Sequence, residues 1–106
     1  MSSEKPSNLS TEEQQFWDAV DMFIDTANTA AEKCDPGVIS SAVVYAAARY
    51  CAFNVASFSE SRKDFISDTE DSVNHLVQEF RKLLEENMAD YGENYKIYMK
   101  DEEEPK

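Results

Sequence analysis

The chain has 106 residues, and its 10 Lys and Arg against 22 Asp and Glu give a formal net charge of −12. This length fits one domain and excludes a TIM barrel or a two-domain dinucleotide enzyme, while two Gly leave too few turn residues for a many-stranded sandwich or barrel. The excess of acidic residues argues against direct binding of nucleic-acid phosphates and of anionic membrane surfaces.

Residues 1–9 are polar, contain Pro6 and lack apolar periodicity, so they are predicted to form a disordered N-terminal arm. Ser10 and Glu13 have the spacing of a capping box, in which each residue binds a backbone N–H of the other. Apolar residues then recur every three or four positions, which predicts an amphipathic helix over residues 11–34. These positions are Phe16, Val20, Phe23, Ile24, Ala27, Ala31 and Cys34.

Asp35, Pro36 and Gly37 predict the next helix start, with Asp as the cap and Pro in the first turn. The helix over residues 38–58 is expected to run antiparallel to the first, because the link is short. At 100° per residue, apolar side chains cover both of its sides. One side holds Val38, Ala42, Tyr45, Ala46, Phe53 and Ala56, and the other holds Val44, Ala47, Ala48, Cys51, Val55 and Phe58.

A helix that is apolar all round must be buried all round, and two neighbouring helices cover only part of it. The remaining side is predicted to be an association site, most simply between two copies of the chain. The residues predicted to make this contact are Ala47, Ala48, Cys51, Val55 and Phe58. They meet either the same helix or the third helix of the second copy; the alternative is a monomer whose alanines face water.

The third helix carries the clearest amphipathic stripe, from Phe65 to Tyr91. It is predicted to start at Ser61 or to restart at Ser67, which opens a second capping box, and to stop at Gly92. The fold class is therefore all-α, an antiparallel three-helix arrangement completed by dimerisation. Residues 10–92 form the helical domain and residues 93–106 an acidic C-terminal tail, whose apolar part at residues 95–99 either packs on the bundle or docks a partner.

Arg49 lies midway along the apolar second helix, where a buried guanidinium needs a carboxylate partner. Glu70 is on the flank of the third helix's stripe at about the right height, which predicts a structural Arg49–Glu70 ion pair. The sharper alternatives are that Arg49, with Tyr45 and Tyr50, binds a small anion, or that it meets a carboxylate across the dimer.

Carboxylates on the outer sides of the first and third helices, among them Asp18, Asp25 and Asp71, are interpreted as solvated faces. His75 is the only histidine, and no Glu stands three residues before it, so the metal-binding Glu-x-x-His motif is absent. Nothing in the sequence places this histidine as a base beside Cys34 or Cys51. No Gly-rich phosphate loop is present either. The sequence therefore predicts a protein that is not an enzyme and holds no metal or other cofactor.

The start of the chain shows no apolar signal region, and Arg49 disfavours membrane insertion of the apolar stretch at residues 38–58. That stretch is instead interpreted as a buried helix of a soluble protein. Cys34 and Cys51 are expected to be too far apart for an intrachain disulfide. These features predict a cytoplasmic protein with free thiols and no membrane partner.

Several segments together resemble a family of small bacterial proteins of unknown function. They are Phe16 to Asp18, Phe23 to Asn28, Tyr45 to Phe53, and Glu79 to Tyr91. The segment from Tyr45 to Phe53 is the most specific, and the tail beyond Gly92 lies outside the resemblance. The resemblance implies a bacterial cytoplasmic protein and supplies no activity, cofactor or catalytic residue.

The function predicted from the sequence is a non-enzymatic protein-interaction module that forms a homo-oligomer through residues 38–58 and binds an unidentified protein. Two alternatives stay open. An acidic nucleic-acid mimic would occupy the basic groove of a DNA-binding protein, because ordered carboxylates can imitate phosphates. A small-anion binder would use Arg49.

Overall fold

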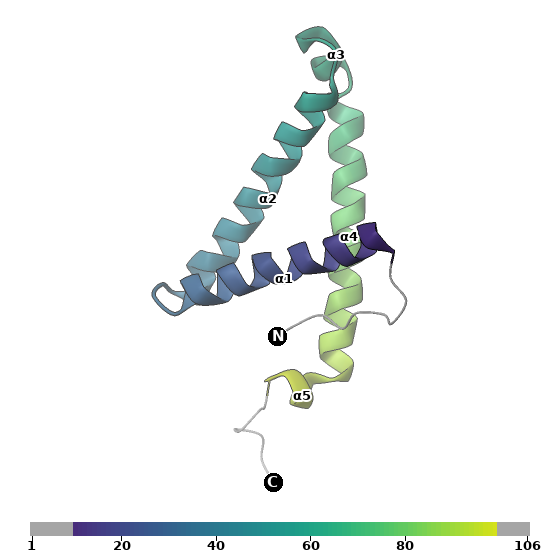
Figure 1. The fold of residues 1–106 in the computed structure, drawn as a ribbon. Helices are drawn as coiled ribbons and strands as arrows, with labels where there is room; N and C mark the ends of the chain where they lie inside the picture. Colours follow the sequence, from purple (N-terminus) through teal and green to yellow (C-terminus); the bar gives the residue numbers. More distant parts are fainter. Residues whose placement is uncertain (1–9, 100–106) are drawn as a thin grey trace. The chain divides into compact units, whose positions relative to one another are not determined.

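A computed structural model describes residues 10–99, and every regular element in that range is an α-helix. Figure 1 shows the order along the chain: three long helices, α1, α2 and α4, with two short helices, α3 and α5. No strand occurs between residues 10 and 99, so the predicted all-α class is confirmed. The antiparallel arrangement of three helices and its completion by dimerisation stay predictions, and the arm at residues 1–9 lies outside the described residues.

Helix α1 spans Thr11–Ala31 and begins with the predicted capping box. The backbone N–H of Ser10 donates to Oε1 of Glu13 at 3.0 Å, and the N–H of Glu13 donates to Oγ of Ser10 at 3.1 Å. The helix ends three residues before the predicted Cys34. There the N–H groups of Lys33 and Cys34 both donate to the carbonyl of Ala30, at 3.0 and 3.1 Å, and close the chain into a turn.

Helix α2 spans Pro36–Phe58 and starts as its sequence predicts. Oδ2 of Asp35 accepts the N–H of Gly37 at 2.9 Å, which satisfies a donor that the first turn of a helix leaves free. Pro36 occupies the first helical position, where an N–H would have no partner within the helix. At the other end, the hydroxyl of Ser59 donates to the carbonyl of Val55 at 3.1 Å.

Removing the Asp35 cap is expected to destabilise the fold measurably. Asp35→Ala leaves the N–H of Gly37 without its carboxylate acceptor, and loss of an N-cap typically costs about 1 kcal/mol. Urea denaturation followed by circular dichroism at 222 nm should show a lower midpoint with an unchanged slope. Asp25→Ala, on the exposed side of α1, is the matched control, and an equal loss in both variants would contradict a capping role.

The helix after Ser61 is interrupted once, so it forms two elements, α3 over Arg62–Ser67 and α4 over Thr69–Glu93. Oγ of Ser61 accepts the N–H of Asp64 at 3.1 Å and caps α3. The capping box predicted at Ser67 is wrong, because Ser67 is the last residue of α3 and Asp68 occupies the junction. The predicted stop at Gly92 is also wrong, because α4 continues through it to Glu93.

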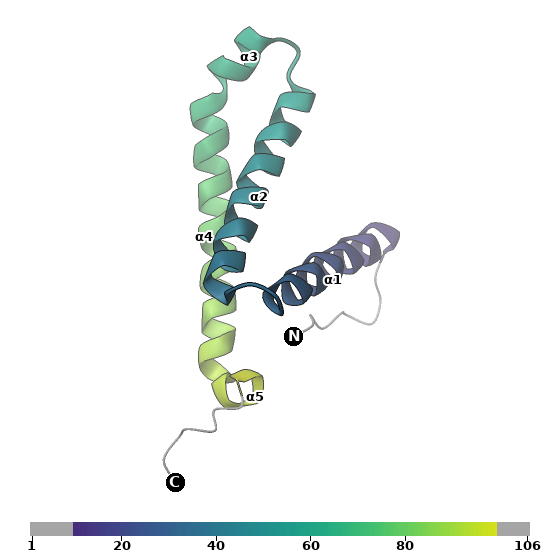
Figure 2. The same cartoon turned by 90° about the vertical axis from the view of Figure 1, so that its left-hand side faces the viewer.

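Helix α5 spans Tyr95–Met99 and lies across the C-terminal end of α4 (Figure 2). The hydroxyl of Tyr98 donates to Oδ2 of Asp90 at 2.8 Å, and the ring centroids of Tyr98 and Tyr91 lie 4.6 Å apart. The side chain of Asn94 also donates to Oδ1 of Asp90 at 2.9 Å. The apolar segment at residues 95–99, whose role the sequence left open, therefore packs on α4.

The chain divides into two units, and the boundary falls after Ala52, inside α2. The first unit holds α1 and most of α2, and the second holds the last turns of α2 with α3, α4 and α5. Between residues 10 and 99, no side chain in either unit is buried. Helix α2 has no buried residue of its own, and the prediction that it is a buried helix stays a prediction.

Candidate interaction surface on helix α2

Helix α2 combines an apolar composition with an almost complete lack of charge. Arg49 is its one charged residue, and none of its 23 residues is buried. The helical period divides the side chains into two opposite surfaces. We call them the Ala47 face (Val44, Ala47, Ala48, Cys51, Val55 and Phe58) and the Arg49 face (Val38, Ala42, Tyr45, Arg49, Phe53 and Ala56).

The Ala47 face contains all five residues that the sequence predicted to make the contact with a second copy. Ala47 and Ala48 are exposed, and Phe58 is 81% exposed, while Cys51 and Val55 are half-buried. A phenylalanine side chain exposed to this degree loses the burial that normally stabilises it. The predicted residues thus lie together on one side of the helix, and their role in self-association stays a prediction.

The Arg49 face is exposed along its whole length. Its largest apolar members are Val38, Tyr45 and Phe53, which are 59%, 67% and 62% exposed, and the other members are exposed as well. The sequence grouped Val38, Ala42, Tyr45, Phe53 and Ala56 with Ala46, and treated Arg49 separately, but did not nominate this side as a contact surface. Arg49 was the signal that distinguishes the two sides, since it gives only one of them a charge.

The two residues of the predicted structural ion pair are both exposed. Arg49 lies in the middle of α2, and Glu70 lies in the first turn of α4. Helical periodicity places Glu70 on the same side of α4 as Val73 and Val77, three and seven residues further on. The pairing of Arg49 with Glu70 stays a prediction.

Charge separates α2 from the other long helices within residues 10–99. Helix α1 has five acidic residues and no basic one, and α4 has seven acidic and two basic residues, so each carries a balance of −5. Helix α2 has no acidic residue and one basic residue. Of the three long helices described, it alone lacks a negative balance in a chain of net charge −12.

Helix α4 offers a second large apolar surface. We call it the α4 stripe, and it is exposed at most of its positions, with Leu76 and Tyr91 half-buried. Its members are Val73, Leu76, Val77, Phe80, Leu83, Leu84, Met88 and Tyr91. Away from the stripe, Nη1 of Arg81 pairs with Oε2 of Glu85 at 3.1 Å in a solvent-exposed ion pair.

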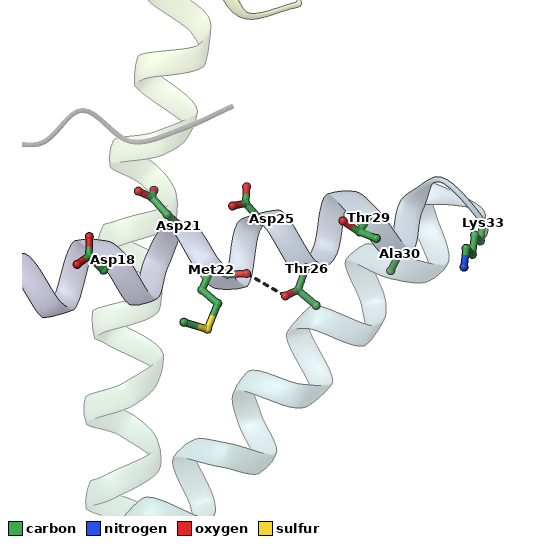
Figure 3. Close-up of a pocket in the computed structure, with 8 residues that line it drawn as sticks. All are labelled: Asp18, Asp21, Met22, Asp25, Thr26, Thr29, Ala30 and Lys33. Carbon is green, nitrogen blue, oxygen red and sulfur yellow. Dashed lines mark hydrogen bonds between the residues drawn. The ribbon is translucent and has the colours of Figure 1, made fainter.

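The carboxylate side of α1 presents an open surface to solvent (Figure 3). All of the residues on this surface come from α1 and the turn that follows. They are Asp18, Asp21, Met22, Asp25, Thr26, Thr29, Ala30 and Lys33. In the part of the chain that is described, no group of three or more Asp, Glu, His or Cys side chains is placed to hold a metal ion.

Helix α2 is the one helix within residues 10–99 that is long and apolar enough to cross a membrane. Length and composition alone are weak support for a membrane span, because the core helices of soluble proteins meet the same criteria. Arg49 near the middle opposes insertion by about 2.5–3.5 kcal/mol on insertion scales. Both thiols of the chain are free, with Cys34 exposed and Cys51 half-buried.

Comparison with known proteins places the chain beside one uncharacterised family. The sequence model of a family described as "Protein of unknown function (DUF3144)" matches residues 16–92. The predicted resemblance to a family of unknown function, from Phe16 to Tyr91, covers almost the same segment and is confirmed. No curated protein and no solved structure matches the chain.

Proposed function

The chain belongs to the DUF3144 family of proteins of unknown function, and we propose from its own surface that it is a non-enzymatic interaction module that self-associates through α2. The single observation that carries this proposal is that α2 is apolar around its circumference and has no buried residue. Exposed apolar patches of this kind are typical of association sites.

Covering the apolar side chains of α2 would contribute a large favourable free energy. Fully burying a Val, Leu, Ile, Phe or Met side chain is worth about 1.5–3 kcal/mol. Phe53 and Phe58 are exposed by 62% and 81%, and Val38 by 59%. Covering these side chains would contribute several times RT toward association, which offsets part of the free-energy cost of bringing two chains together.

The charge distribution leaves room for a second copy on one side of α2. Two copies of a chain with net charge −12 repel each other wherever their acidic helices meet. The predicted contact residues, Ala47, Ala48, Cys51, Val55 and Phe58, carry no charge, and Arg49 points to the opposite side of the helix. The small side chains of Ala47 and Ala48 allow close approach of two helices, so the Ala47 face can pack against a second copy without this penalty.

Composition supports the non-enzymatic half of the proposal. With one His in 106 residues, few side chains can act as a general base at neutral pH. With two Gly, the chain has too few glycines for a Gly-rich phosphate-binding loop. We accordingly propose a cytoplasmic protein without cofactor or membrane partner, whose further partner is another protein. Arg49 and the acidic surface together oppose residence in an anionic bilayer.

The acidic-mimic alternative has the net charge in its favour. Asp18 and Asp25 are exposed on α1, and α4 adds further carboxylates. A mimic would bind a basic groove with an affinity that falls steeply with salt. In many small proteins an acidic surface has no role beyond keeping the protein soluble. Net charge alone is therefore weak support for a mimic, and we place this function second.

Coexpression of tagged and untagged full-length chains tests the proposed self-association. With equal expression and random pairing, the untagged chain is expected to copurify at about one per two tagged chains, because tagged–tagged dimers are recovered as well. The ratio is expected to be the same at low and high salt because the α2 contact is apolar. Recovery of the tagged chain alone would overturn the proposal. Copurification that disappears at high salt would exclude an apolar contact through α2.

A further inference from the structure

The apolar spacing of helix α4 continues past the end of that helix into α5. In the last part of the α4 stripe, Leu84, Met88 and Tyr91 follow one another at intervals of four and three residues. Tyr95 and Tyr98 of α5 continue the same intervals. If α4 ran on as one helix, all five side chains would lie within about 80° of one another around its axis. The sequence of α5 therefore fits one side of a longer α4.

The chain leaves the path of α4 at Asn94. The φ of −115° and ψ of 32° of this residue lie outside the α-helical region, whereas the residues directly before and after it are helical. The N–H of Asn94 donates to the carbonyl of Asp90 at 3.0 Å, as in a helix, but the N–H of Ile97 donates to the carbonyl of Asn94 at 3.0 Å. In an unbroken α-helix, the N–H of Ile97 would donate to Glu93. A change in the backbone angles of Asn94 is therefore enough to join the two helices into one.

Contacts with Asp90 and Tyr91 hold α5 in the folded-back position that Figure 2 shows. Oδ2 of Asp90 accepts the hydroxyl of Tyr98 at 2.8 Å, and Oδ1 of Asp90 accepts the side-chain amide of Asn94 at 2.9 Å. The rings of Tyr91 and Tyr98 lie 4.6 Å apart. In a continuous helix, Tyr98 would lie about 10.5 Å along the axis from Tyr91 and about 12 Å from Asp90, too far for either contact. The folded-back position and the continuous helix therefore exclude each other.

The folded-back position covers Tyr91 but buries little of α5 itself. Tyr91 is half-buried, whereas Met88, one turn earlier on the α4 stripe, is 67% exposed. In α5, Tyr95, Ile97 and Met99 are 50%, 72% and 52% exposed. A helix of five residues is not stable on its own in water. Its position therefore depends strongly on the polar contacts with Asp90.

We infer that residues 94–99 form a two-position switch at the end of α4, with Asn94 as its hinge and Asp90 as its latch. In the closed position, which the structure shows, α5 folds back and Tyr98 covers Tyr91. In the open position, α4 continues through Met99, Tyr91 is uncovered, and the α4 stripe gains Tyr95 and Tyr98. The switch thus sets the length of the apolar surface that α4 presents. It lies within the second unit and does not depend on the proposed self-association.

A full-length chain that carries both Asn94→Ala and Tyr98→Phe tests the switch. Asn94→Ala removes one amide bound to Asp90 and places a strong helix former at the hinge, and Tyr98→Phe removes the other donor but keeps the ring. The ratio of open to closed chains is expected to rise by at least about tenfold. In NMR spectra, nuclear Overhauser contacts between the rings at positions 91 and 98 should be present in the unsubstituted chain and lost in the variant. The Cα chemical shifts of the variant should become helical without a break from residue 93 to residue 99.

A chain that carries both Asn87→Ala and Tyr95→Phe is the matched control. Asn87 lies inside α4, where its side-chain amide donates to the carbonyl of Leu83 at 2.8 Å, and Tyr95→Phe leaves the bond between Tyr98 and Asp90 in place. The control makes the same two chemical changes away from the hinge and the latch. Its ring contacts and the non-helical shift of Asn94 are expected to match those of the unsubstituted chain.

The NMR data overturn the switch in three cases. Ring contacts that persist in the Asn94→Ala, Tyr98→Phe chain would mean that Asn94 and the Tyr98 hydroxyl do not hold α5 closed. Loss of the ring contacts together with loss of helical shifts at residues 95–99 would mean that α5 unwinds and does not join α4. Equal opening in the control would mean that general helix propensity, and not the hinge and latch, controls the position of α5.

Discussion

Ala47→Glu is expected to prevent the proposed self-association and to leave the protein a monomer. Ala47 is an exposed residue in the middle of the Ala47 face, and the substitution places a carboxylate in a contact without a cationic partner on that face. Burying an unpaired charge costs several kcal/mol. With two copies of the substitution in each dimer, the dissociation constant should rise by about 100-fold or more, at about 1.4 kcal/mol per tenfold.

Dilution series by light scattering measure this effect. Ala89→Glu is the matched control, because Ala89 is an exposed alanine on α4 on the side opposite the α4 stripe. That variant makes the same change in charge and should keep the mass of the unsubstituted protein. Equal weakening by both variants would mean that net charge, and not the Ala47 face, controls association.

The second large effect concerns thermal stability, which is expected to depend on protein concentration. No side chain within residues 10–99 is buried, and the proposed self-association would cover apolar surface of the helices between two copies. The folded state of such a dimer is favoured by mass action. For two chains of this size, the melting temperature should rise by roughly 4 °C for each tenfold increase in concentration.

Circular dichroism melts from low to high micromolar concentration test this dependence. Ala47→Glu provides the comparison, because a monomeric variant should melt at a lower temperature that does not change with concentration. A melting temperature of the unsubstituted chain that stays constant across this range would show that the chain is stabilised without a second copy.

Local features of the fold were predictable because their signals lie within a few residues of one another. The capping box of Ser10 and Glu13 and the cap formed by Asp35 both depend on contacts two or three residues apart. Ser67 shows the limit of this reasoning. It has the residues of a capping box around it, but Ser61 has already started a helix that includes Ser67 as its last residue.

Helix α5 could not be predicted from such signals. It has only five residues, and the bond from Tyr98 to Asp90 that holds it spans eight residues and depends on where α4 ends. Since α4 continues past Gly92, Asn94 becomes the residue that turns the chain and binds Asp90. The tail boundary drawn at residue 93 in the sequence therefore separates two segments that contact each other.

The apolar character of the surface of α2 was predictable from the sequence, but the ranking of its two faces was not. Its uniform apolarity predicted a helix with no water-facing side, and both of its faces are candidates for a contact. Periodicity cannot rank two equally apolar faces, so the Arg49 face with Tyr45 and Phe53 was not nominated. The ranking required the exposure of each side chain, which depends on the folded chain and not on the spacing of its apolar residues.

The mass of the full-length chain in solution tests self-association most directly. Sedimentation equilibrium at several concentrations should give 2 × 12.1 kDa at high concentration, with a reversible decrease toward 12.1 kDa on dilution. A mass of 12.1 kDa at every concentration up to the millimolar range would mean that water, and not a second copy, covers helix α2, and would contradict self-association through this helix.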